Sequence, residues 1–187
     1  MKKFPFLFLT IALFGCLLSS CLGNEVSNWE EYKDWRNANI AWLEEMASKT
    51  NDDGTPYFKK VSRSWYPNAY VYMHYYNDTN LTRDNLTPLY TSTVDTKYIG
   101  YLYDGTPFDS SFLNTSPADS ILRTTLDNVI VGWTVALSSM HVGDSCEVLI
   151  PFESAYGNTS NNIIKPYSAL RFSIKLVDIP GYEIKPN

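Results

Sequence analysis

The feature of this sequence that most constrains its fold is an ordered series of glycines, aromatic residues and aliphatic pairs between residues 98 and 172. Asp104-Gly105 separates two apolar segments, which is a hairpin signal. Residues 145–151 and 168–179 alternate between apolar and polar side chains and predict two further strands. Strands joined by short turns, with few helical segments among them, indicate an α+β fold built on an antiparallel sheet of about five or six strands.

The motifs of this segment also have a characteristic order. From the N-terminal side they are Tyr98-Ile99-Gly100-Tyr101-Leu102-Tyr103-Asp104-Gly105, Phe108-Asp109, Val129-Ile130, Gly132-Trp133, Ala155-Tyr156-Gly157, Ile163-Ile164 and Ala169-Leu170-Arg171-Phe172. In order and spacing this series resembles the FKBP-type peptidyl-prolyl cis/trans isomerases. The resemblance implies a curved antiparallel β-sheet wrapped around one short helix at residues 129–139, to which this chain adds an N-terminal helical segment. It also implies a reaction that needs no metal, no nucleophile and no cofactor.

The resemblance assigns roles to particular residues. It implies a catalytic set at the edge of an apolar pocket, in which Ile130 contributes its backbone N–H and the other members contribute polar side chains: Tyr98, Asp109, Ile130 and Tyr156. It implies a substrate-binding wall whose indole lies under the proline ring: Phe108, Val129, Trp133, Ile163, Ile164 and Phe172. The alternative for the large apolar members is an ordinary packed core. Asp109 and Tyr156 favour a pocket, since both are in turns beside apolar residues.

Two departures from the family pattern leave two functions open. The neighbourhood of Ser120 lacks the aromatic residue that often precedes the aliphatic pair, and the loop at 158–162 is short and polar. One hypothesis is an active prolyl isomerase that assists the folding of exported proteins and acts on proline-containing polypeptides. The other is an FKBP-like module that binds peptide or protein with little catalysis.

The first 21 residues have the pattern of an export signal. Lys2 and Lys3 precede an apolar stretch that is too short for a membrane span, and Leu18-Ser19-Ser20-Cys21 resembles a bacterial lipobox. Lipidation at Cys21 would anchor the protein to a membrane of the bacterial cell envelope, namely the outer membrane at its periplasmic or surface face. The alternative is an ordinary secretory signal cleaved near the same place.

Residues 22–68 are predicted to contain a linker and an amphipathic helix. Ser27 and Glu30 form a capping box, and apolar residues then recur at roughly helical spacing. The helix can pack on its own domain or form a homodimer with a second copy. The isomerase domain is expected at 69–180, followed by a tail at 181–187.

Composition excludes several other classes of function. The net charge is −5 and lysine and arginine form no runs, which argues against a nucleic-acid partner. Two histidines and three cysteines, of which Cys16 and Cys21 lie in the export signal, do not support a metal site or a Cys/His nucleophile. Cys146 lies in an alternating apolar stretch, so a packing role is expected for it.

Overall fold

The computed structural model describes residues 27–160 and 163–181. The chain divides into two units, residues 1–31 and residues 32–187, and in the first of them helix α1 (Asn28–Glu31) begins directly after Ser27. The backbone N–H groups of Glu30 and Glu31 both donate to the Ser27 carbonyl. The lipobox with Cys21, the rest of the predicted export signal and nearly all of the expected tail lie outside the described residues.

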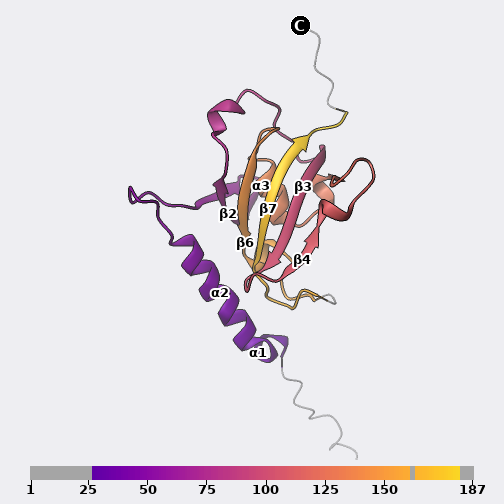
Figure 1. Ribbon diagram of the computed structural model, residues 1–187. Helices are drawn as coiled ribbons and strands as arrows, with labels where there is room; N and C mark the ends of the chain where they lie inside the picture. The colour runs from indigo at the N-terminus through magenta and orange to yellow at the C-terminus, as the bar shows by residue number, and fades with distance from the viewer. Residues whose placement is uncertain (1–26, 161–162, 182–187) are drawn as a thin grey trace, which may run out of the picture. The chain divides into compact units, whose positions relative to one another are not determined.

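The second unit begins with a long helix and continues as an antiparallel sheet of seven strands (Figure 1). Its helices are α2 (Lys33–Ala47) and α3 (Val131–Leu137), with short 3-10 turns η1 (Thr79–Leu81), η2 (Ser111–Leu113), η3 (Leu126–Asn128) and η4 (Phe152–Ser154). Its strands are β1 (Lys59–Arg63), β2 (Tyr66–Tyr75), β3 (Thr93–Leu102), β4 (Pro107–Ser110), β5 (Leu122–Thr125), β6 (Ser145–Ile150) and β7 (Leu170–Asp178). The α+β class is therefore confirmed.

The strand order is β1-β2-β6-β7-β3-β4. The seventh strand, β5, also pairs with β3: it pairs with residues 93–96, whereas β4 pairs with residues 99–101 of the same strand. Two short strands, β4 and β5, raise the number above the five or six that the sequence predicts. Strand β4 follows the predicted hairpin turn, where Gly105 has φ +86° and its N–H donates to the Leu102 carbonyl. The sheet also begins at Lys59, ahead of the expected domain start at residue 69, because β1 pairs with β2 along its whole length.

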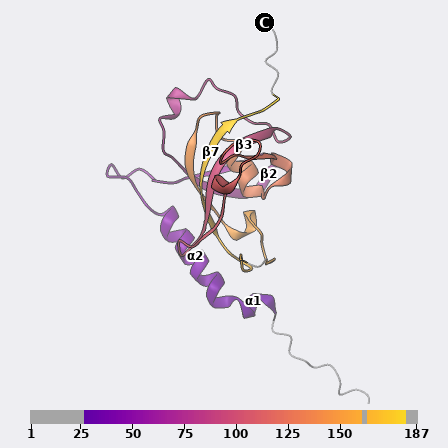
Figure 2. The same ribbon diagram turned by 45° about the vertical axis from the view of Figure 1, so that its right-hand side comes forward.

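Helix α3 packs against one face of the sheet, where it contacts β1 and β2 (Figures 1 and 2). The helix is buried from Gly132 to Leu137, and its side chains join those of β2, β3, β6 and β7 in one apolar core. Gly132 allows the helix to approach β6 closely, since a Cβ there would lie 2.4 Å from Cγ2 of Ile150. Cys146 is part of this core, which agrees with its expected packing role.

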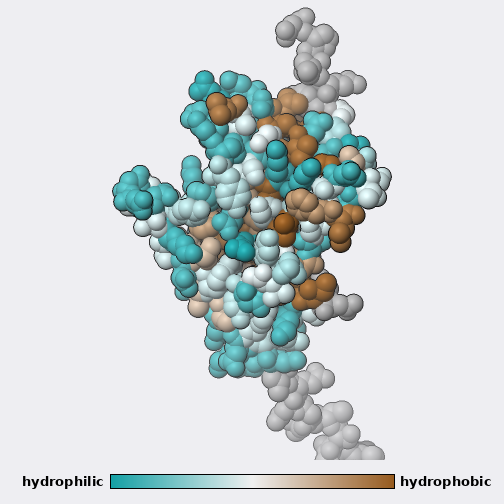
Figure 3. Space-filling model, viewed as in Figure 1, coloured by the Kyte–Doolittle hydropathy of each residue, from teal (hydrophilic) through white to brown (hydrophobic). Residues whose placement is uncertain are grey.

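Helix α2 packs on the same domain through polar contacts as well as apolar ones. Asn39 is fully buried, and its Oδ1 accepts a hydrogen bond of 2.9 Å from the Ala169 backbone N–H. Trp35 donates from Nε1 to Ser168 Oγ at 3.0 Å, and its ring lies edge-on to Tyr103 with 5.0 Å between centroids. Packing on its own domain is thus the arrangement that the structure shows for this helix. Figure 3 shows largely hydrophilic side chains over α2 on the visible face.

None of the helices among residues 27–160 and 163–181 is long and apolar enough to cross a membrane.

Candidate active site

A cavity of about 410 Å³ opens between α3, the strands β3 and β4, and the turn after η4. Its lining comes from six separate parts of the chain: Tyr98, Phe108, Asp109, Leu122, Asn128, Val129, Ile130, Trp133, Tyr156 and Phe172. Eight of the ten side chains that the sequence assigns to a pocket are in this lining. Because they are spread over 75 positions of the sequence, from 98 to 172, it is the sheet that brings them together.

The inner wall of the cavity is a cluster of aromatic rings in edge-to-face contact. The Trp133 ring lies 4.9 Å from that of Tyr98 and 5.3 Å from that of Phe172, with interplanar angles of 88° and 84°. Phe108 meets Phe172 at 5.6 Å and 83°. This geometry is a favourable one for aromatic pairs. Trp133 is only 4 % exposed, so its indole belongs to the core and to the cavity wall at once.

Gly100 makes this ring arrangement possible. It lies on β3 opposite Phe172 of β7 and Asp109 of β4. A Cβ at this position would lie 2.7 Å from Cε1 of Phe172 and 2.8 Å from Cζ of Phe108. Any side chain here would therefore displace the two phenylalanine rings from the cavity wall.

The polar edge of the cavity is formed by a hydrogen-bonded pair. The Tyr98 hydroxyl donates to Asp109 Oδ2 at 2.7 Å, and the Ser110 backbone N–H donates to Asp109 Oδ1 at 2.8 Å. Ser111, which is fully buried, holds the backbone of Tyr98 by accepting its N–H at 2.9 Å. Desolvation, together with the hydrogen bond to Asp109, raises the pKa of Tyr98 well above its usual value, so the phenol remains neutral. Tyr156, across the opening, is 42 % exposed, and desolvation raises its pKa too.

A backbone donor lies at the start of α3. Ile130 immediately precedes the helix, and its carbonyl accepts hydrogen bonds from Trp133 and Thr134. Its own N–H makes no hydrogen bond to the described part of the chain, and Ile130 lines the cavity. Thr134 Oγ1 donates to the Leu126 carbonyl at 2.7 Å, which fixes the turn η3 against the helix. The donor is therefore held rigidly at the opening of an apolar cavity.

Two expected wall residues are not in the lining, and two unexpected ones are. Ile164 is buried in the core, at 3 % exposure, and Ile163 is 58 % exposed. Both follow the loop at 158–162, whose length the sequence pattern does not determine. Leu122 takes part in the wall at the place where the sequence lacks an aromatic residue, and Asn128 adds a side-chain amide from η3. The alternation of β5 could have indicated Leu122, whereas no sequence signal marks Asn128.

The chemistry that this arrangement allows is that of an enclosed apolar surface with a few fixed polar groups at its edge. Among the described residues, no group of three or more histidine, cysteine, aspartate or glutamate side chains is placed to hold a metal ion. His74 is a strand residue stacked on Tyr57 at 3.7 Å, and His141 lies beside the buried Asp144, so neither histidine is at the cavity. The polar groups at the cavity are suited to hydrogen bonding.

Comparison with known proteins identifies the same region of the chain. Residues 86–177 match the model of the FKBP-type peptidyl-prolyl cis-trans isomerase family. The FKBP-type 22 kDa peptidyl-prolyl cis-trans isomerase of Escherichia coli (strain K12) is 41% identical over 93 residues, which are 49% of this chain and 43% of that protein. The outer membrane protein MIP of Legionella longbeachae is 39% identical over 90 residues, 48% of this chain and 37% of that protein. The match thus covers less than half of the length of either relative.

A solved structure supports the fold. The peptidyl-prolyl cis-trans isomerase of Pseudomonas syringae pv. tomato superposes with a TM-score of 0.60 at 26% identity, covering 79% of this chain and 95% of that one. The matched family region, 86–177, contains every residue of the cavity lining.

Proposed function

We propose that this protein catalyses cis/trans isomerisation of X-Pro bonds in polypeptides and assists the folding of exported proteins, because residues 86–177 match the model of the FKBP-type peptidyl-prolyl cis-trans isomerase family. The observation that carries the proposal is the cavity floored by Trp133, with Tyr98, Asp109 and the Ile130 N–H at its edge. Each of these groups fits one requirement of the reaction.

The first requirement is to lower the energy of a twisted amide. Resonance gives the planar peptide bond a rotation barrier of about 18–20 kcal/mol. The planar form is dipolar and is stabilised by water, whereas the twisted form has a less polar carbonyl and a more basic nitrogen. Transfer of the X-Pro bond into the aromatic cavity removes water and so favours the twisted form. Each tenfold gain in rate needs about 1.4 kcal/mol, an amount that desolvation and a few fixed hydrogen bonds supply together.

The second requirement is to hold the peptide while one bond rotates. The proline ring lies on Trp133, beside the edge-to-face pair of Phe108 and Phe172. The Ile130 N–H donates to a carbonyl of the substrate, and the Tyr156 hydroxyl donates to the peptide from the other side. Asp109, oriented by Tyr98, faces the rotating amide. Val129 completes the wall on the side of α3.

The direct test is an isomerisation assay on short X-Pro peptides without a coupling protease, using protein that lacks residues 1–21. We expect rates above the uncatalysed reaction, which takes roughly tens to hundreds of seconds. Rates equal to the uncatalysed ones over a panel of X residues would falsify the enzyme proposal. Peptide binding without acceleration would leave the second candidate, a binding module, for which the aliphatic Leu122 in the wall is the favouring observation.

We further propose that Cys21 is lipidated and that the lipid attaches the protein to a membrane of the cell envelope. The lipobox-like Leu18-Ser19-Ser20-Cys21 supports this, as does the similarity to a protein described as an outer membrane protein. The variant Cys21→Ala should move the protein from the membrane fraction to the soluble fraction. An unmodified N-terminus on soluble wild-type protein would rule the anchor out.

A further inference from the structure

A second hollow, of about 240 Å³, lies between α2, β2 and the turn η4, and we call it the α2 groove. Apolar and aromatic side chains form most of it, and two glutamates line it as well: Asn39, Ile40, Leu43, Glu44, Tyr70, Tyr72, Pro151, Phe152, Glu153 and Ala169. None of these residues lines the cavity at Trp133. The groove is therefore a separate surface that the proposed reaction does not use.

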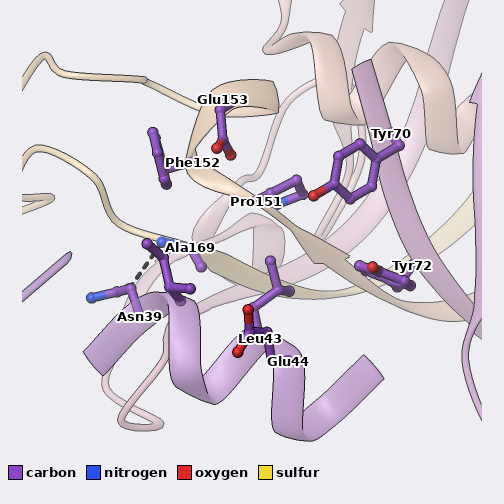
Figure 4. A pocket seen from close by; sticks show the side chains of 10 residues that line it. Asn39, Leu43, Glu44, Tyr70, Tyr72, Pro151, Phe152, Glu153 and Ala169 are labelled. Carbon is purple, nitrogen blue, oxygen red and sulfur yellow. Dashed lines mark hydrogen bonds between the residues drawn. The ribbon is translucent and has the colours of Figure 1, made fainter. Parts of the chain in front are cut away.

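The two carboxylates enter the groove from opposite walls. Figure 4 shows Glu153 coming from the turn and Glu44 from α2, with the phenol of Tyr70 directed into the space between them. The nearness of Glu153 is one of the causes that raise the pKa of Tyr70, after desolvation and the charge of Tyr72. Among residues 27–160 and 163–181, neither glutamate has a lysine, arginine or histidine nitrogen within the 4.0 Å of an ion pair. The groove thus has negative charge that the described part of the chain does not neutralise.

The surroundings of Tyr70 already accommodate one cation. Lys60 Nζ lies 3.7 Å from the centroid of the Tyr70 ring. Lys60 is not part of the groove lining, and it makes no ion pair with either glutamate. An aromatic ring, an apolar floor and two carboxylates together suit a side chain with a long apolar stem and a charged end, which describes lysine and arginine.

The α2 groove and the cavity share a wall. Ser154, in η4, is buried, and its Oγ both accepts from the Tyr70 N–H at 3.2 Å and donates to the Tyr70 carbonyl at 3.0 Å. On its other side, the Ser154 carbonyl oxygen lies 3.0 Å from where a Cβ of Gly132 would be. Glu153 of the groove is three residues from Tyr156 of the cavity, a separation of at most about 11 Å between Cα atoms. An extended polypeptide advances about 3.3–3.6 Å per residue, so this separation corresponds to about three residues of a bound chain.

We propose that the α2 groove binds a lysine or arginine side chain of the same polypeptide whose proline occupies the cavity. This inference builds on the proposed isomerase function and adds a substrate class to it, namely polypeptides with a basic residue a few positions from the proline. Glu44 and Glu153 supply the charge, and Tyr70, Ile40 and Leu43 contact the stem. An ion pair near the surface is weak, so two carboxylates acting together should give a preference of about three- to tenfold, which corresponds to roughly 0.7–1.4 kcal/mol.

The experiment compares pairs of X-Pro peptides that differ only by arginine or glutamine, placed at each of several positions around the proline. We expect kcat/KM to be about three- to tenfold higher for arginine at one or two positions, and the preference to fall at about 0.5 M salt, where charges are screened. The double variant E44Q/E153Q should abolish the preference for arginine and leave kcat/KM for the glutamine peptides unchanged. The double variant D52N/D84N, which changes the net charge equally at exposed sites outside both linings, should retain it.

A second measurement does not depend on catalysis. A fluorescent arginine peptide without proline should bind the wild type more tightly, in fluorescence anisotropy, than E44Q/E153Q. If the wild type has no isomerase activity but still binds the arginine peptide more tightly than E44Q/E153Q does, the proposed function is rejected and the groove remains a binding site for a cation. Equal binding of arginine and glutamine peptides, or an equal loss in D52N/D84N, would overturn the inference, since general electrostatic attraction would then explain the data.

Discussion

The cavity at Trp133 and the α2 groove both combine aromatic rings with carboxylates, yet they differ in what those carboxylates contact. Asp109 accepts hydrogen bonds from Tyr98 and from the Ser110 N–H, so part of its capacity is already used within the protein. Glu44 and Glu153 have no ion-pair partner among the described residues and are exposed. A carboxylate that is oriented by its neighbours serves geometry, whereas one without a partner is available for an incoming charge. The two regions therefore differ in whether their carboxylates already have partners within the protein, and not in the residue types that they contain.

The largest effect is expected from Trp133→Leu. The indole contacts Tyr98 and Phe172 and floors the cavity, so its loss should lower kcat/KM by about tenfold or more and the free energy of unfolding by about 2 kcal/mol. The α2 groove does not contain Trp133, so binding of the arginine peptide should persist. Assays of rate, denaturant midpoint and peptide anisotropy on one preparation would check all three. Normal catalysis by the folded variant would show that the cavity is core and not a site.

Gly132→Ala acts on the wall between the two regions. The added Cβ would lie 2.4 Å from Ile150 Cγ2 and 3.0 Å from the Ser154 carbonyl oxygen. Overpacking typically costs about 1–3 kcal/mol, which exceeds the roughly 1 kcal/mol that alanine gains over glycine in a helix. We therefore expect a net loss of about 1–2 kcal/mol in urea unfolding, with weaker binding at both regions. A variant as stable as the wild type would mean that α3 and η4 are less tightly packed than the structure shows.

Asp109→Asn tests orientation at the cavity alone. The amide oxygen can still accept from the Ser110 N–H, and the amide nitrogen can donate to the Tyr98 hydroxyl, so a hydrogen bond to a charged carboxylate becomes a neutral one of reversed direction, at a cost of about 1 kcal/mol or less. We expect kcat/KM about fivefold lower for arginine and glutamine peptides alike. The ratio between the two peptides, which reports the groove, should not change. A changed ratio with an unchanged rate would reverse the roles assigned to the two regions.

The smallest effect is expected on the pH dependence of stability, in a comparison of Tyr98 from the cavity with Tyr70 from the α2 groove. The pKa values of both Tyr98 and Tyr70 are raised by desolvation above the 10.0 of a free phenol, and the shift is the larger one at Tyr98. The neutral phenol is thus favoured by folding, so its contribution to stability is full below about pH 10 and is lost as pH rises beyond it. Tyr98→Phe should flatten the loss of stability between about pH 9 and about pH 11 more than Tyr70→Phe does. Equal slopes for the two variants, from denaturant midpoints, would contradict the stronger burial and bonding of Tyr98.

Much of the cavity could be predicted because its residues belong to elements with clear local signals. Tyr98 and Phe172 lie on alternating strands, Phe108 follows an Asp-Gly turn, and Trp133 follows an aliphatic pair and a glycine. Ile163 and Ile164 are not in the cavity lining, because the path of the irregular loop before them depends on contacts that no periodicity expresses. The extent of the sheet was underestimated for a related reason: β4 and β5 have four residues each, too few for a period to be read.

The sequence by itself determined the class of the fold, the match of residues 86–177 to the FKBP-type isomerase model and most of the side chains around the cavity, since each depends on patterns within short segments. Only the tertiary structure decided that α2 packs on its own domain, through hydrogen bonds of Asn39 with Ala169 and of Trp35 with Ser168. The apolar periodicity of the sequence had left a second copy open as its partner. The tertiary structure also decided that Glu44 and Glu153, 109 positions apart, line the same groove. Charges at such a separation become neighbours only when packing has brought a helix and a turn together, and no local signal in the chain expresses that packing.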